Sequence, residues 1–263
     1  GEMTYYLSGK RKEKGVVLLS CLVFLLILLI IVRFAVTSSR LEERKAGADY
    51  EMMTARQAAQ TAIRQAEKFI LEQGLQSCIR TAGANIPGIT AGGNIEAQCK
   101  EKNPAELANI FWKAKDANEL NTALTAIGQP GIVQKGIYTY SFIKTRTECR
   151  PFWICVNWSQ DAKSVLNTSK QLNRGATNNL ESLECNTCGT LSGIKPRFII
   201  ERFLADDLKE IEFSDLATDS KLSLKSKEVV VFRITTVGFG NGDGGNNVNT
   251  TNAVMQAIYI LNG

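Results

Sequence analysis

The chain has 263 residues, which is enough for one or two domains with a sizeable core. Its composition is ordinary for a globular protein, with 44% hydrophobic and 22% charged residues and a net charge of +5, and this small surplus gives no indication of nucleic-acid binding. The chain has no histidine, which removes the commonest general base and the commonest metal ligand. The sequence also shows no nucleophile–base pair, phosphate-binding loop or metal-ligand cluster, and we expect no catalytic residues, no metal, no cofactor and no small-molecule substrate.

A long apolar segment begins at residue 16. Residues 16–32 read VVLLSCLVFLLILLIIV without a charge, and residues 34–36 extend the run beyond Arg33. About 20 helical residues cross a bilayer core, so 16–36 is long enough if Arg33 reaches the interface. Four basic residues between positions 10 and 14 precede the run, which predicts a cytoplasmic N-terminus and a C-terminal side across the membrane.

The alternative for this segment is a secretory signal peptide that is removed after export. The apolar run is longer than the hydrophobic part of such a peptide, and no small-x-small cleavage motif follows it directly. Ala46-Gly47-Ala48 has that pattern but lies beyond the charged stretch RLEERK. The sequence therefore favours a retained membrane helix.

The helical pattern continues past the apolar segment, through residues 37–73. Apolar residues recur there at steps of mostly three and four, which predicts one buried stripe on an amphipathic helix. Its members are Met52, Ala55, Ala59, Ala62, Ile63, Ala66, Phe69 and Ile70. Gly47 could bend the helix and Gly74 could cap its end. A short coiled-coil stalk is the alternative, but the stripe is short for a coiled coil.

The residues from 74 to 263 are expected to form an α+β globular domain. Pro104–Ala126 has an apolar face and predicts one helix, whereas 137–144, 151–158, 198–204, 229–237 and 253–261 are candidate strands. Residues 238–252 are too polar and glycine-rich for regular structure. Asn241, Asp243, Asn246 and Asn247 in that loop suggest calcium, but one carboxylate without EF-hand spacing favours a plain connection. The expected fold is a long helix packed on an antiparallel sheet.

One of the seven cysteines lies in the apolar segment, and the other six lie after it. Cys21 lies in the apolar segment, where it acts as a small hydrophobe. The other six follow the expected membrane crossing, and an even number in an oxidising compartment suggests three disulfides. They are Cys78, Cys99, Cys149, Cys155, Cys185 and Cys188. Fifteen connectivities are open, and we take pairing between neighbours in the sequence as the working expectation.

The pair Cys185-Asn-Thr-Cys188 also has the spacing of metal and redox motifs. A tetrahedral zinc site needs four ligands, and neither a histidine nor a second CxxC is present. A thioredoxin-like site needs its CxxC at the start of a helix, whereas NNLESLECNTCGTLSG has the composition of a loop. A structural disulfide is therefore favoured.

The N-terminal pattern resembles the class III signal of type IV pilins, in which a basic stretch ending in glycine precedes an apolar helix that runs into an amphipathic one. The stretch from KGVVLLSCLVFLLILLIIV to TARQAAQTAIRQAE is similar to the PilX/PilK type of minor pilin, and so are KPRFIIERF, VVVFRITTVGFG and TTNAVMQAIYIL near the C-terminus. The resemblance covers about 90 residues at the two ends; the middle, from about 74 to 191, resembles nothing. It implies a prepilin leader at 1–15, cut between Gly15 and Val16 by a prepilin peptidase, with methylation of the new amine.

Two positions depart from the pilin pattern. Most pilins have Phe at the first mature position, where this chain has Val16, and major pilins have Glu at the fifth, where it has Ser20. That carboxylate is thought to pair with the terminal amine of a neighbouring subunit. Because a buried carboxylate is costly unless paired, its absence suits a non-repeating subunit that resides alone in lipid, although Ser20 is also an ordinary small polar residue of a membrane helix.

The resemblance implies a minor pilin that primes assembly of a type IV pilus near its tip, with other minor pilins, the major pilin and the prepilin peptidase as partners. The chain would be a single-pass protein of the bacterial inner membrane with a periplasmic domain, and later part of the pilus. Two alternatives are an adhesive or aggregation-promoting module that the pilus displays and a minor pseudopilin of a type II secretion system.

Overall fold

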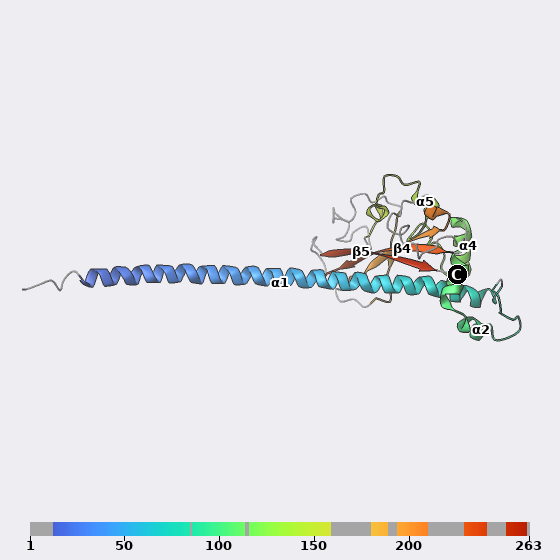
Figure 1. Ribbon diagram of the computed structural model, residues 1–263, viewed down its shortest axis with the longest axis horizontal. Coiled ribbons are helices and arrows are strands. Elements are labelled where there is room, and N and C mark those ends of the chain that lie inside the picture. The colour runs from blue at the N-terminus through green and yellow to red at the C-terminus, as the bar shows by residue number, and fades with distance from the viewer. Residues whose placement is uncertain are drawn as a thin grey trace, which may run out of the picture. The chain divides into compact units, whose positions relative to one another are not determined.

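The computed structural model describes residues 13–84, 86–113, 116–158, 180–188, 194–209, 229–240 and 251–261. The chain divides into two compact units, residues 1–50 and 51–263, and the 68-residue helix α1 (Glu13–Arg80) contributes to both. The second unit contains the rest of the secondary structure. It is α+β, as expected from the sequence (Figure 1).

The sheet is built on β3 (Arg197–Leu204), β4 (Val230–Phe239) and β5 (Asn252–Leu261), which pair antiparallel in that order. The three strands lie where β-branched and aromatic residues predict them, so these strand predictions are confirmed. Two short strands, β1 (Ile137–Thr139) and β2 (Leu183–Glu184), pair along the other edge of β3. Because β1 is parallel to β3, the sheet is mixed, and the expectation of a purely antiparallel sheet is wrong.

The second half of α1 lies along one face of this sheet (Figure 1). Its buried apolar residues on this face include Ala55, Ala58, Ala59, Ala62, Ala66 and Ile70, which confirms most of the predicted stripe, whereas Met52 is exposed, contrary to the prediction. Small side chains let the helix approach the sheet closely, and Gly238 of β4 completes the fit. A Cβ atom at Gly238 would lie 2.0 Å from the carbonyl oxygen of Ala55. The Thr236 hydroxyl donates a hydrogen bond to the carbonyl of Ala59 at 3.0 Å.

The helix does not end at Gly74, because α1 continues to Arg80. Gly74 serves a close approach instead of a cap: a Cβ atom there would lie 2.3 Å from the backbone nitrogen of Ala108. After α1, the short helix α2 (Ile95–Glu101) begins at the Asn94 cap, whose side chain accepts from Ala97 N.

The single helix predicted over 104–126 is two helices, α3 (Pro104–Trp112) and α4 (Ala117–Ala126). Asp116 forms a capping box with Glu119, which starts a new helix in the middle of the apolar pattern. The break allows Trp112 to enter the core, where its indole donates to the carbonyl of Ile70 at 2.9 Å and its ring meets Phe232 edge to face. Helix periodicity could not show the break, because both helices contribute apolar residues to the same core cluster.

Two further strand predictions are wrong in part or in full. Residues 137–144 form only the three-residue β1, followed by one helical turn, α5 (Tyr140–Ile143). Residues 152–155 form the 3₁₀ helix η1 (Phe152–Cys155). An extended strand spans about 3.3 Å per residue, so a strand through 149–155 could not bring its ends together. The disulfide between Cys149 and Cys155 holds those Cα atoms 5.6 Å apart and requires a compact turn.

Side chains from these segments cover the second face of the sheet, the face opposite α1. Tyr138 and Phe152 pack there with Ile199 and Val237 in a second core cluster. A short 3₁₀ helix, η3 (Asp207–Lys209), follows β3, and the Asp207 carboxylate accepts from the backbone nitrogen of Leu204 at 2.8 Å. The loop 241–250, with the four residues considered for calcium, lies outside the described residues, as does the leader 1–12.

Candidate functional site

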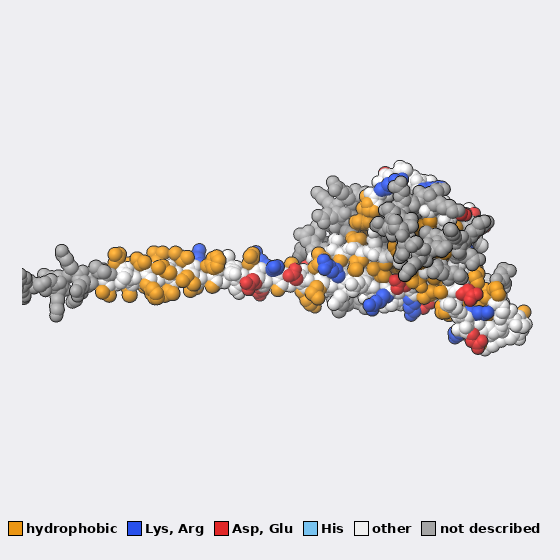
Figure 2. All heavy atoms as spheres, in the orientation of Figure 1, with side chains coloured by type: hydrophobic (Ala, Val, Ile, Leu, Met, Phe, Trp, Pro, Cys, Tyr) orange, Lys and Arg blue, Asp and Glu red, His pale blue; other side chains and the backbone are white. Residues whose placement is uncertain are grey.

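The first unit presents an apolar helix surface with no protein packed on it among the described residues. From residue 17 to residue 36 every side chain is exposed, including Leu29 at 67% and Phe34 at 77%. Figure 2 shows hydrophobic side chains gathered along this part of α1. Exposed apolar surface of this extent is costly in water and stable in a hydrocarbon environment. By length and composition this is one helix that could span a membrane.

The polar side chains of this segment are satisfied by the helix itself. The Ser20 hydroxyl donates to the carbonyl of Val17 at 2.9 Å, and the Thr37 hydroxyl donates to the carbonyl of Arg33 at 2.8 Å. A hydroxyl bonded within its own helix can reside in lipid without a partner from a neighbouring chain. At the fifth position after Gly15, this chain therefore has a self-contained polar group where a carboxylate would require a partner.

Gly15 and Val16, the residues expected to flank the cleavage site, lie within α1, which is described from Glu13. Their side chains are outside the described part, and cleavage between them stays a prediction. Cys21 is exposed and is the one cysteine without a disulfide.

Three disulfides join the remaining cysteines within the second unit. They connect Cys78 with Cys99, Cys149 with Cys155, and Cys185 with Cys188, with Cα–Cα distances of 6.0, 5.6 and 5.4 Å. All three join neighbours in the sequence, as in the working expectation. The first ties the end of α1 to α2, and all six residues are buried. Within the described residues, no group of three or more metal-ligating side chains converges.

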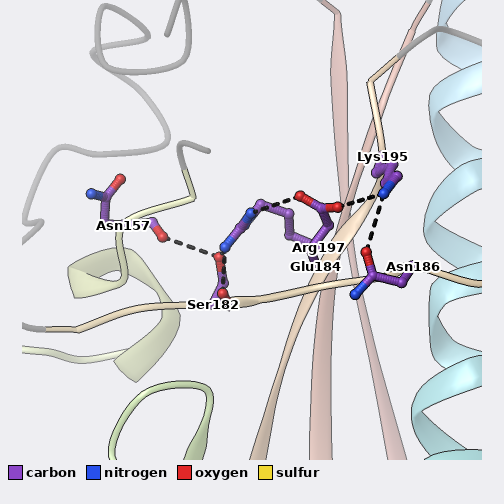
Figure 3. A network of polar contacts seen from close by, with 6 residues as sticks. All are labelled: Asn157, Ser182, Glu184, Asn186, Lys195 and Arg197. Atoms are coloured by element: carbon purple, nitrogen blue, oxygen red, sulfur yellow. Dashed lines mark hydrogen bonds and ion pairs between the residues drawn. The ribbon is translucent and has the colours of Figure 1, made fainter. Parts of the chain in front are cut away.

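A polar network holds the Cys185–Cys188 loop against the start of β3 (Figure 3). Lys195 donates to Glu184 at 2.7 Å and to Asn186 at 3.1 Å. Arg197 donates to the hydroxyl of Ser182 at 2.6 Å and to the carbonyl of the same residue, and the Ser182 hydroxyl donates to the carbonyl of Asn157 at 3.1 Å. Burial lowers the pKa of Arg197, while Glu184 and Glu181 oppose the shift.

The same loop also contacts α1. The Thr187 hydroxyl donates to the side chain of Gln65 at 2.9 Å, and Cys185 and Cys188 belong to the main core cluster. The disulfide therefore lies between helix and sheet, where it acts as an apolar packing group. This position agrees with the structural role that the sequence favoured over a zinc or redox site.

A buried ion pair spans the two central strands. Both oxygens of Glu201 accept from Arg233, at 2.8 and 2.5 Å, and the guanidinium lies 5.4 Å from the centre of the Phe203 ring. The Glu201 side chain is fully buried, and burial raises its pKa although the bonds from Arg233 oppose the rise. Arg202, on the opposite face of β3, donates to the carbonyl of Trp112 at 3.0 Å, and burial lowers its pKa to about 10.

The roles of Glu201, Arg202 and Arg233 were not predicted from the sequence. PRFIIERFL predicts a strand, but nothing in its composition indicates that Glu201 and Arg202 are buried on opposite faces. The signal that could have found them is the alternation itself: charged residues inside a strand with apolar neighbours at every other position must be paired. Arg233, within the apolar strand β4, is the matching charge.

Comparison with known proteins identified no matching family model, no curated relative and no solved structure.

Proposed function

We propose that this chain is a minor pilin that helps to prime assembly of a type IV pilus, after cleavage of a prepilin leader between Gly15 and Val16. The observation that carries the proposal is the exposed apolar segment 17–36, followed in the same helix by an alanine stripe that packs on a sheet. The first feature suits a helix that passes from lipid into a bundle of similar helices, and the second suits a rigid attachment of an extracytoplasmic domain.

The cysteines and Ser20 support this proposal in separate ways. Three disulfides in the second unit suit an oxidising compartment beyond the membrane, whereas the free thiol of Cys21 lies in the apolar segment. The Ser20 hydroxyl, bonded to Val17, suits a subunit that does not need the fifth-position carboxylate of a repeating subunit. The proposed partners are therefore other pilins that supply the contacts in the filament.

Processing tests the first step of this proposal. The full chain is co-expressed with a prepilin peptidase, and its intact mass is measured. We expect a mature chain that begins at Val16, and we expect Gly15→Leu to remain uncut. Gly47→Leu is the matched control, because it changes a glycine of the same helix with no atom within 4 Å of its Cβ position, and it should be cut normally. A mature chain that lacks residues 16–36 would instead identify a removed signal peptide and contradict the proposal.

Deletion of the gene in the producing organism tests the assembly role. We expect fewer surface filaments by electron microscopy, with restoration by the wild-type gene and no restoration by the Gly15→Leu variant. Normal filament numbers with lost adhesion would favour the adhesive module, and normal filaments with a secretion defect would favour a pseudopilin.

A further inference from the structure

The outer edge of β5 is long and open. β5 lies at the end of the sheet, and β4 pairs with one of its edges over ten consecutive residue pairs. No strand in the described part of the chain pairs with its other edge. An unpaired strand edge is a row of backbone donors and acceptors that can bind a further strand.

The pairing with β4 identifies the residues whose backbone groups point outward. Gly240 N donates to the carbonyl of Thr251 at 2.7 Å, so these residues form a hydrogen-bonded pair at the start of the ladder. In an antiparallel ladder, bonded and non-bonded pairs alternate. The register of β4 and β5 therefore directs the N–H and C=O groups of Val254, Gln256, Ile258 and Ile260 to the open edge.

Within β5 itself, four features that normally prevent strand addition are absent: charge, proline, a β-bulge and shortness. Residues 251–261 contain no charged residue and no proline. The register with β4 runs without interruption from Asn252 to Leu261, so there is no β-bulge. Edge strands of natural sheets are usually protected by one of these features or by shortness, and β5, at ten residues, has none of them.

The side chains beside the open edge indicate the chemistry of an added strand. Val254 packs against the cluster around Tyr138 and Phe152, and Ile260 packs against the cluster around Phe203. Between them, Ile258 is 41% exposed. A strand with apolar side chains at alternate positions would extend both clusters and cover Ile258, whereas a charged strand would bring its charges against an edge that offers no partner.

We propose that the open edge of β5 binds an uncharged β-strand, with apolar residues at alternate positions, that belongs to a different protein chain. A second copy joined edge to edge is the other source of such a strand. Along the sheet, α1 runs antiparallel to β4, since Ala55 meets Gly238 and Ala59 meets Thr236. Antiparallel pairing of two β5 edges would therefore make residues 51–80 of the two copies run in opposite directions, whereas two chains in one membrane enter it from the same side. The exclusion of a second copy rests on the proposed function, whereas the observation of an open edge does not.

The test places a photo-crosslinking amino acid, p-benzoylphenylalanine, at Gln256 of the full chain in intact producing cells. The same group at Thr122, an exposed residue of α4, gives the background. We expect an adduct at position 256 at least tenfold above that background. Peptide sequencing by mass spectrometry should place it in an uncharged, alternating segment of a different polypeptide.

A second change at Ile258 shows whether the adduct depends on strand addition. Ile258→Glu places a charge on the open edge, across from an arginine that is already paired with Glu201, and it should reduce the adduct at least tenfold. Ile258→Thr, uncharged and β-branched, should retain it. The melting temperature of both variants verifies folding. A background-level adduct, an adduct within the same chain or to a second copy, or equal yields with Glu and Thr would overturn the inference.

The result is independent of the test of the proposed function. An unprocessed Gly15 with a specific adduct at 256 would refute the pilin proposal and support strand addition, while normal processing with no adduct would do the reverse.

Discussion

Two glycines mark the places where other backbone segments come nearest to α1. Gly238 of β4 meets Ala55 and Ala59, and Gly74 of α1 meets Ala108 of α3. In both, the two nearest atoms that a Cβ would meet belong to the backbone, which cannot rotate away as a flexible side chain can. A methyl group there must push two secondary-structure elements apart.

Gly238→Ala should therefore destabilise the second unit by about 3 kcal/mol, the upper part of the usual range for overpacking. The measurement is denaturant unfolding of the detergent-solubilised full chain with its disulfides intact. Gly47→Ala is the matched control: no atom lies within 4 Å of that Cβ position, so the unfolding midpoint of residues 51–263 should not change. Equal midpoints for wild type and Gly238→Ala would contradict the close packing of helix and sheet.

The ion pair of Glu201 and Arg233 has a pH signature. Burial raises the pKa of Glu201 above the ordinary value of 4.5, and Arg233 opposes this rise. The folded state thus binds this proton more tightly than the unfolded state. It follows that the free energy of unfolding falls as the pH rises from 4.5 through the raised pKa, and the stability is fully present only below that window.

Arg233→Met should enlarge this dependence, because it removes the group that opposes the rise. Removing one member of a buried pair costs about 3 kcal/mol at neutral pH, and the loss should shrink as the pH falls towards 4.5. Unfolding curves between pH 4 and pH 8 measure it. The double variant Arg233→Met/Glu201→Gln removes the titrating group and should lose the extra slope; the same slope in both variants would show that another group causes it.

At the scale of elements, the disulfides close loops of very different length. The bonded residues are separated by 21, 6 and 3 positions, in chain order. In the chain-entropy model, a longer loop restricts the unfolded chain more and stabilises the folded state more.

Replacement of each cysteine pair by serines should therefore follow the order of loop length. We expect losses of about 3 kcal/mol for Cys78/Cys99, about 2 kcal/mol for Cys149/Cys155 and about 1.5 kcal/mol for Cys185/Cys188. Thermal unfolding of the three double variants measures the order. A largest loss for Cys185/Cys188 would show that packing between α1 and the sheet, rather than loop closure, dominates its contribution.

The elements also show what sequence patterns can and cannot predict. The strands β3 and β4 were predictable because both are rich in β-branched and aromatic residues, and β5 because it is a largely apolar segment that follows a glycine-rich loop. Residues 137–144 also have apolar side chains at alternate positions, yet only the three residues that pair with β3 form a strand. Residues 151–158 were mistaken for a strand because a tertiary constraint, the Cys149–Cys155 bond, outweighs local preference. A short apolar run in the sequence does not show whether a disulfide will require a compact turn.

Some features of the candidate site were predictable from the sequence and others were not, for the same reason. The apolar segment and the cysteines are visible in the sequence because each is a property of composition and spacing. Charged residues inside an apolar strand indicate that a partner is needed, but which partner Glu201 has, the network around Arg197 and the open edge of β5 depend on which strands become neighbours, and no local pattern encodes that. The bond from Ser20 to Val17 was accessible in principle, since a serine in a helix commonly bonds a carbonyl one turn earlier.

At the scale of the whole molecule, Cys21 provides a native label for the membrane-spanning proposal. The other six cysteines are bonded, so Cys21 is the one free thiol. In sealed vesicles containing the full chain, a charged maleimide should not modify Cys21 until detergent dissolves the bilayer. The matched variant Cys21→Ser/Ser38→Cys moves the thiol past the apolar run, and it should react at least tenfold faster on the side that the reagent can reach. Rapid labelling of Cys21 in intact vesicles would contradict the proposal.

The locality of the three sulfur bridges has a consequence for the order of folding. Each bridge becomes possible as soon as a short stretch of chain has emerged, because both of its cysteines precede the next pair in the sequence. By contrast, the alanine stripe of α1 packs on strands that lie in the last third of the chain. The stripe is synthesised early, and its non-covalent partners are synthesised last. Oxidation can therefore proceed in step with emergence from N- to C-terminus without forming a wrong pair, while the hydrophobic core closes only when the chain is complete.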